Sequence, residues 1–243
     1  METLTSGDVA VDVVPERGAI VTGLRVGNRD VLYLDRTTLD DPTKNVRGGV
    51  PLLFPFAGKL KDETFVLTGT KMKQHGFARN KAWRVTDRSK ATLTMRLDCD
   101  DETRAQFPYD FTATHRILVL PDGVQLELTV SAGGLKVPVS PGWHPYFNCT
   151  DKPAVREGFT DASEFDFGEV APTDGISHWP ALALEITADP VLRHLQFWSQ
   201  PGKPFVCIEP FYGTAGTINT EARGWVPANS ARTYWMRIRV TGR

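Results

Sequence analysis

Apolar and polar residues alternate along much of this chain with the period of two that is typical of half-buried β-strands. Near the start, Val9, Val11 and Val13 alternate with Ala10 and Asp12. Residues 20–26 and 31–34 continue the pattern on either side of a turn at Gly27-Asn28. Because short apolar runs bounded by glycine turns are typical of hairpins, we expect short antiparallel strands here.

The same pattern predicts strands farther along the chain. These strands are expected at residues 65–67, 83–87, 92–97, 111–120 and 124–131, in the segment FVCIEPFYG, and at residues 233–240. Pro121, Asp122 and Gly123 separate the two longest ones and form a strong hairpin signal. In the last segment, every second residue from Tyr234 to Val240 is apolar, which predicts a strand with one buried face.

Three segments interrupt this rhythm. Residues 46–58, VRGGVPLLFPFAG, combine prolines that cannot donate to a ladder with glycines, so we expect a loop or an edge segment. Residues 151–189 carry weak signals, apart from Phe165 and Phe167, which alternate around Asp166, and we expect His178 in a loop. Residues 191–199 fit either a helix, by the spacing of Val191, Leu195 and Trp198, or a strand at 194–199.

Short strands and turns without long helical patterns predict an all-β fold, a large antiparallel β-sandwich. No linker or low-complexity tract divides residues 1–243, so we expect one domain. The formal net charge of -1 gives no reason to expect nucleic acid or an anionic membrane as partner.

The N-terminus lacks an export signal, and no segment is apolar and long enough to span a bilayer. Cys99, Cys149 and Cys207 are odd in number and widely spaced, so we expect free thiols and no thiolate metal site. Both observations favour a cytoplasmic protein. The oligomeric state is not indicated.

His144 lies in SPGWHPYFNC, among prolines and aromatic residues that restrict its ring. An imidazole with an ordinary pKa of about 6.5 exchanges protons near neutral pH, so a fixed histidine is typical of general acid–base catalysis. A structural histidine in a turn is the alternative. His115 lies in the middle of a predicted strand and is expected to be structural.

Two further segments carry candidate chemistry. In QHGFARN, Gly76 permits a sharp bend after His75, and the imidazole with Arg79 could hold a hydroxyl-rich or anionic ligand. The alternative is a capped strand entry with a surface arginine. In FVCIEPFYG, an extended chain places Cys207 and Glu209 on one face, where a buried carboxylate needs partners. Arg47 either anchors its loop or binds an anion.

QHGFARN, GWHPYFN and CIEPFYG, together with the preceding VRGGVPLLFPFAGKLKDETF, resemble the aldose 1-epimerase (galactose mutarotase-like) family. The resemblance runs from about Arg47 to the C-terminus, and the motifs fall in the family's order. It implies a large antiparallel sandwich that binds a sugar ring and interconverts the α and β anomers of an aldohexose.

The resemblance assigns His144 as the acid that protonates the ring oxygen, Glu209 as the base for the anomeric hydroxyl, and His75 as a second imidazole that holds the sugar. These roles agree with the opening of a cyclic hemiacetal, which removes one proton and delivers another and needs no metal or organic cofactor. We also expect the aromatic residues Trp143 and Tyr146 to contact the sugar.

The chain departs from the family at one position and leaves another open. Lys59 stands where many members carry an arginine, so hydroxyl binding there is expected to differ. The family's sugar-binding aspartate matches no single residue, and Asp161, Asp166 and Asp174 are the candidates.

RGGVP and HGFAR also resemble the branch that acts on hexose 6-phosphates, in which arginines bind the phosphate. Arg47 and Arg79 would fill that role here. Asp62 and Glu63 lie between them in the sequence and could neutralise them, so a neutral aldohexose remains our first choice of substrate.

Three other classes of protein compete with this interpretation. A non-catalytic carbohydrate-binding sandwich would explain the aromatic residues but has no need for His144 with Glu209. A metal-dependent enzyme would use His75, His144 and Glu209, although such ligands usually cluster closely on one or two strands. A cysteine hydrolase would use Cys207, but no helix N-terminus is expected near that thiol.

Overall fold

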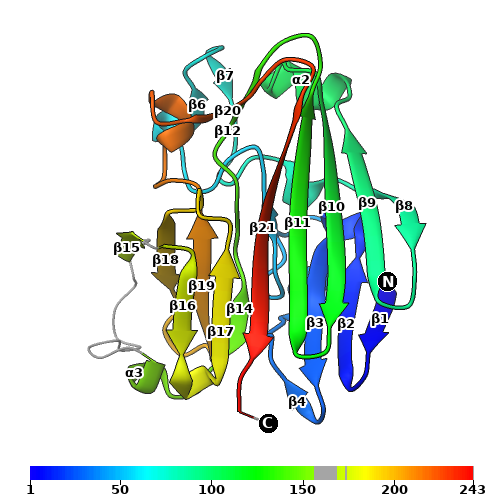
Figure 1. The fold of residues 1–243 in the computed structure, drawn as a ribbon. Coiled ribbons are helices and arrows are strands. Elements are labelled where there is room, and N and C mark those ends of the chain that lie inside the picture. The colour runs from blue at the N-terminus through cyan, green and yellow to red at the C-terminus, as the bar shows by residue number, and fades with distance from the viewer. Residues whose placement is uncertain (156–168, 173, 243) are drawn as a thin grey trace.

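The computed structural model describes residues 1–155, 169–172 and 174–242, which form the expected antiparallel β-sandwich (Figure 1). A seven-stranded sheet makes one layer. In spatial order its strands are β16 (Ile176–Trp179), β17 (Leu184–Ala188), β21 (Ala231–Val240), β11 (Gly123–Ala132), β10 (Phe111–Leu120), β9 (Thr92–Asp98) and β8 (Arg84–Arg88). The hairpin predicted between residues 120 and 124 is confirmed, with Leu120 paired to Gly123.

The other layer contains a six-stranded sheet and a four-stranded sheet. The first consists of β15 (Glu169–Pro172), β18 (His194–Trp198), β19 (Phe205–Phe211), β13 (Gly142–Trp143) and β5 (Leu52–Leu53), with β14 (Tyr146–Asn148) also paired to β19. The second consists of β1 (Glu2–Ser6), β2 (Val9–Val14), β3 (Ile20–Val26) and β4 (Arg29–Asp30). Isolated bridges from Val21 to Val50 and from Leu32 to Phe147 join the two sheets.

Short elements complete the described part of the chain. Two small two-stranded sheets pair β6 (Thr64–Phe65) with β7 (Thr70–Lys71) and β12 (Val137–Val139) with β20 (Gly224–Val226). The α-helices are α1 (Arg36–Asp40), α2 (Asp101–Gln106) and α3 (Lys152–Val155), and the 3-10 turns are η1 (Pro15–Arg17), η2 (Lys61–Glu63), η3 (Ala78–Asn80), η4 (Pro180–Leu182) and η5 (Thr217–Asn219). None of the described helices is long and apolar enough to cross a membrane.

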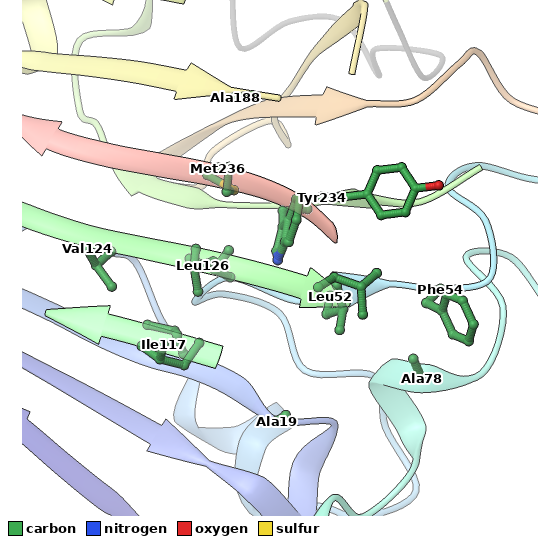
Figure 2. Packing of buried hydrophobic residues seen from close by; sticks show 14 of the residues in the cluster. Ala19, Leu52, Phe54, Ala78, Ile117, Val124, Leu126, Ala188, Tyr234 and Met236 are labelled. Carbon is green, nitrogen blue, oxygen red and sulfur yellow. The ribbon is translucent and has the colours of Figure 1, made fainter. Parts of the chain in front are cut away.

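The main core lies between the two layers. Figure 2 shows Ile117, Leu126 and Met236 of the seven-stranded sheet in the same apolar cluster as Leu52 and Phe54 of the other layer. Each large apolar side chain that is fully buried here contributes about 1.5–3 kcal/mol of transfer free energy. The alternation read from the sequence is the cause, because each strand turns every second side chain into this layer.

The strand alternative for residues 194–199 is confirmed, because residues 194–198 form β18 and their backbone pairs with β15 on one side and β19 on the other. Other expectations need correction. His178 lies in β16 rather than in a loop. Residues 31–34 make only isolated bridges among the described residues. Phe165 and Phe167 lie outside the described residues.

The VRGGVP segment, residues 46–58, forms both a loop and the edge of a sheet, as expected, since β5 within it is the terminal strand of the six-stranded sheet. It is nevertheless buried from Gly48 to Phe56. Gly49 adopts a φ of 64°, and a Cβ at this position would overlap the carbonyl oxygen of Val21. The glycine therefore allows the segment to pack directly against β3.

Candidate active site

The candidate site is built on the face of β19 that points away from the main core. Val206 and Ile208 belong to the main core, so Cys207 and Glu209 project from the opposite face. Directly paired residues in an antiparallel sheet share a face, which brings Gln196 beside Glu209, and Tyr146 and Trp198 beside Cys207. The sheet thus collects polar and aromatic side chains around one carboxyl group.

His144 reaches this face from the connection between β13 and β14. Its backbone N–H donates to the carbonyl of Pro51 at 3.0 Å, and the N–H of Tyr146 donates to Gly49 at 2.9 Å. The imidazole stacks on the Tyr146 ring with centroids 4.7 Å apart and planes 11° apart. The VRGGVP segment therefore fixes the histidine through backbone hydrogen bonds, while tyrosine fixes the plane of its ring.

His144 and Glu209 meet in a buried contact. The distance from His144 Nε2 to Glu209 Oε1 is 3.4 Å, and the glutamate side chain is 0% exposed. Among the residues that the structure describes, neither carboxyl oxygen of Glu209 has a hydrogen-bond partner, and neither does Nδ1 of His144. A buried carboxyl group without donors is costly, so this arrangement needs a reason other than stability.

Burial shifts the pKa values of Glu209 and His144 in opposite directions. Loss of solvent raises the pKa of Glu209 well above its ordinary value. Loss of solvent, reinforced by Arg79 and Arg47, lowers the pKa of His144 to about 3. Both shifts favour the neutral forms, a protonated carboxyl group beside a neutral imidazole.

The ring of His75 packs edge-on against the ring of His144. His75 adopts a φ of 68° before Gly76, and its ring centroid lies 5.7 Å from that of His144. Nδ1 accepts the backbone N–H of Gly58 at 2.9 Å, so a neutral ring carries its proton on Nε2. Nε2 lies 3.0 Å from the side-chain amide nitrogen of Gln74, and it donates to this amide when the amide oxygen faces the ring. Burial, then Arg79, His144 and Lys59, lower the pKa of His75, which favours this neutral form.

Arg47 and Arg79 converge on the same two rings. Both guanidinium groups lower the pKa of His144, and both act against the burial that raises the pKa of Tyr146. Arg47 lies over the Trp198 ring, 5.8 Å from its centroid, and Arg79 donates to the carbonyl of Gln74 at 3.0 Å. Within the described chain, Nη1 of Arg47 and Nε of Arg79 are buried without a hydrogen-bond partner. Anchoring through backbone carbonyls is therefore seen for Arg79 and not for Arg47.

The other predicted residues are distributed differently. Lys59 is exposed beside the site, next to Gly58. Trp143 is not brought to the site, because its ring is fully buried in the main core and its indole N–H donates to His115 Nε2 at 3.5 Å. His115 is buried in the core, as expected for a structural histidine. Asp174 is exposed and accepts the N–H of Ile176, while Asp161 and Asp166 lie outside the described residues.

Gln196 is the residue that sequence reasoning missed. Its side chain is buried on the site face, paired across the sheet with Glu209. The alternation of residues 194, 196 and 198 was a usable signal, but it was hidden by the choice between helix and strand. An amide beside the carboxyl group adds a donor and an acceptor for a hydroxylated ligand.

Cys207 completes the cluster. Its thiol, the imidazole of His144 and the carboxyl group of Glu209 each offer an atom within 4.8 Å of the others. Burial, followed by the neighbouring Glu209, raises the pKa of Cys207 well above its ordinary value, which keeps the thiol protonated. This shift disfavours the cysteine-hydrolase alternative, because a thiolate is the nucleophile in such enzymes.

Comparison with known proteins connects this geometry to a family. The sequence profile of the family described as aldose 1-epimerase matches residues 2–180. A Salmonella typhimurium protein named "Putative glucose-6-phosphate 1-epimerase" is 29% identical over 252 residues, which cover 86% of this chain and 80% of that protein. An Escherichia coli protein of the same name is 31% identical over 166 residues, which cover 63% of this chain and 51% of that protein.

Solved structures agree with the sequence comparison. A protein from Synechocystis sp. PCC 6803 has a TM-score of 0.83 at 26% identity, with 100% of this chain and 96% of that chain covered. A galactose mutarotase related enzyme from Lactobacillus acidophilus shares the fold, with a TM-score of 0.74 at 17% identity and coverage of 99% and 97%. Because the profile spans well over half of the sequence, the chain belongs to the aldose 1-epimerase family and is an isomerase.

Proposed function

We propose that Glu209 and His144 interconvert the α and β anomers of an aldohexose by opening and re-closing its ring. Glu209 takes the proton of the anomeric hydroxyl while His144 delivers a proton to the ring oxygen, and the bond between the anomeric carbon and the ring oxygen breaks. Rotation about the adjacent carbon–carbon bond and the reverse proton transfers then give the other anomer. Each cycle returns both residues to their starting state.

The observation that carries this proposal is the buried 3.4 Å contact between the two groups. Burial raises the pKa of Glu209 and so favours a proton on this carboxyl group. Transfer of that proton to His144 creates a carboxylate base and an imidazolium acid without changing the net charge of the site. Hydroxyl groups of a bound sugar supply the hydrogen bonds that the carboxyl oxygens lack, and so favour this reactive form.

Two neighbouring groups are placed to orient the sugar. His75 contributes an imidazole whose ring centroid lies 5.7 Å from that of His144, and Gln196 contributes an amide next to Glu209. Fixed groups of this kind hold the reacting hydroxyl in line with its base, and misplacement by about 1 Å costs about a hundredfold in rate. We assign both residues to substrate positioning, together with Tyr146, which stacks on His144.

The test is the rate of anomer exchange, measured by NMR or polarimetry on chelator-treated protein. Glu209→Gln and His144→Ala are each expected to lower turnover by about two to four orders of magnitude. The chain offers a matched control pair, His178 and Glu185, which lie 3.4 Å apart with the histidine largely exposed. His178→Ala and Glu185→Gln should leave turnover unchanged. Turnover within about threefold of wild type in either site variant, with an intact fold, would contradict the assigned roles.

A second candidate substrate is the 6-phosphate of the same sugar. Arg47 and Arg79 converge on the site, and each has a buried nitrogen without a hydrogen-bond partner among the described residues, which favours this substrate. Neither arginine forms an ion pair with Asp62 or Glu63 in the part of the chain that the structure describes. The printed names of the two relatives point the same way.

Comparison of the two substrates decides between these candidates. If the arginines bind phosphate, Arg47→Ala and Arg79→Ala each raise the KM for the phosphate by about tenfold or more and barely change that for the neutral sugar. Equal fractional losses on both substrates would show that the arginines have a structural role. The small-molecule substrate and three free thiols fit a cytoplasmic location.

A further inference from the structure

The side chains of Cys207, His144 and Glu209 at the proposed reaction centre also have the chemistry of metal ligands. Cys207 and Glu209 project from one face of β19 two positions apart, and His144 faces them from the neighbouring connection. One sulfur, one nitrogen and one oxygen therefore lie within 4.8 Å of one another, and all three residues are buried. Thiolate, imidazole and carboxylate are the ligands that Zn²⁺ prefers in proteins.

The separations suit a tetrahedral ion. Two ligands bound at about 2.0–2.1 Å with a tetrahedral angle stand about 3.3 Å apart, and a sulfur with a nitrogen about 3.5 Å apart. His144 Nε2 and Glu209 Oε1 are already 3.4 Å apart. The thiol of Cys207 lies within 4.8 Å of both atoms, so a shift of about 1.3 Å or less would bring it into the same sphere.

The charges also balance. Binding displaces the protons of the Cys207 thiol and the Glu209 carboxyl group into solution, and the resulting thiolate and carboxylate carry two negative charges, which a divalent ion neutralises beside a neutral imidazole. The described residues leave both oxygens of Glu209 without a hydrogen bond, so a cation supplies what the buried carboxyl group lacks. The positive charges of Arg47 and Arg79, which already lower the pKa of His144, repel the cation and limit the affinity of the site for it.

We infer that Cys207, His144 and Glu209 form a binding site for a thiophilic divalent cation such as Zn²⁺, and that the bound ion inhibits the enzyme by occupying its acid and its base. The binding follows from the arrangement of the ligands. The inhibition rests on the proposed function of His144 and Glu209. The ion competes with the sugar, because the same two groups cannot hold both.

Direct binding is tested with Co²⁺ and Zn²⁺ on chelator-treated, full-length protein. Co²⁺ should produce the near-ultraviolet absorption of a cobalt–thiolate bond, and one equivalent of Zn²⁺ should displace it. Cys207→Ser should abolish the absorption, whereas Cys149→Ser, which alters a buried thiol outside the cluster, should retain it. Absence of the absorption in the wild type, or its persistence in Cys207→Ser, would overturn the inference.

Inhibition is tested by anomer exchange in the presence of Zn²⁺. Zn²⁺ should raise the apparent KM for the sugar, a chelator should reverse the effect, and Cys207→Ser should need about tenfold more Zn²⁺ or greater for half-inhibition. Loss of a thiolate ligand causes this shift, since metal affinity depends on the donor set. A chelator-treated enzyme that is inactive refutes the proposed function but leaves the absorption test of the site intact. An active enzyme that Zn²⁺ does not inhibit refutes the inhibitory role alone.

Discussion

At the scale of single residues, Glu209 shows a conflict between stability and catalysis. Its carboxyl group is 0% exposed and receives no hydrogen bond from the described residues. Such a group destabilises the fold whenever it is ionised, yet the proposed reaction needs it as a base. The same burial raises its pKa well above the ordinary value, and a higher pKa makes the carboxylate a stronger base.

Replacement of Glu209 by glutamine should therefore stabilise the protein while it removes activity. The folded pKa lies above the ordinary value of 4.5, so the folded state holds the proton more tightly than the unfolded state. Wild-type stability must then fall as the pH rises from about 4.5 through the folded pKa, and Glu209→Gln does not share this loss. Urea unfolding at about pH 8 should show the variant more stable by about 0.5–2 kcal/mol.

The gain in stability should shrink toward about pH 4, where the carboxyl group is protonated in both states. Glu185→Gln serves as the control, because this glutamate pairs with an exposed histidine on β16. A gain that is equal at both pH values would argue against ionisation of Glu209 as its cause.

At the scale of elements, the site depends on backbone positions that admit only glycine. Gly76 follows His75 with a φ of 66° and packs against the Phe54 carbonyl, where a Cβ would also come within 2.6 Å of Pro55 Cδ. The bend and the close approach together hold the His75 ring against its donor, the N–H of Gly58. A side chain here must displace the β5 segment or the histidine.

Gly76→Ala should destabilise the protein by about 1–3 kcal/mol and lower kcat/KM by about tenfold or more, because strain at this turn moves His75. Gly202→Ala is the matched control, since Gly202 has a φ of 68° with no atom within 4 Å of a Cβ. It carries the same conformational penalty without the clash. Equal effects of the two substitutions on exchange rate and urea unfolding would rule out close packing at Gly76 as the cause.

At the scale of the whole molecule, the six-stranded sheet has two functions on its two faces. One face closes the main core against the seven-stranded sheet, and the other carries the proposed chemistry. Trp143 and His144 are neighbours in the sequence but lie on opposite sides of this division. Substitutions on the core face of this sheet should therefore change stability, whereas substitutions on the other face should change sugar binding.

Trp143→Phe should lower the free energy of unfolding by about 1–3 kcal/mol, because it leaves a space in the core and removes the donor to His115. The KM for the sugar should stay within about twofold of wild type. Trp198→Ala, on the site face, should instead raise the KM, since its ring packs edge-on against His144. A larger change of KM for Trp143→Phe than for Trp198→Ala would show that Trp143 contacts the sugar.

Much of the fold follows from local patterns. Alternation predicted the long strands β10, β11 and β21, and the Pro121-Asp122-Gly123 turn predicted how the first two pair. The three motifs, through their resemblance to the family, predicted that His75, His144 and Glu209 lie together, and the structure brings their side chains into one buried cluster. The signals left β18 undecided, because Val191, Leu195 and Trp198 fit helical spacing while residues 194–199 fit a strand.

The tertiary structure alone decided which side chains meet. In β19 all seven residues are buried, so the pattern of apolar residues does not reveal which face carries the site. Alternation shows that Cys207 and Glu209 share a face, but strand pairing places Gln196 beside Glu209 and Tyr146 beside Cys207. The physical reason is that local periodicity determines the direction of a side chain relative to its own strand, whereas its partners come from segments far away in the sequence, brought into register by burial of the common core.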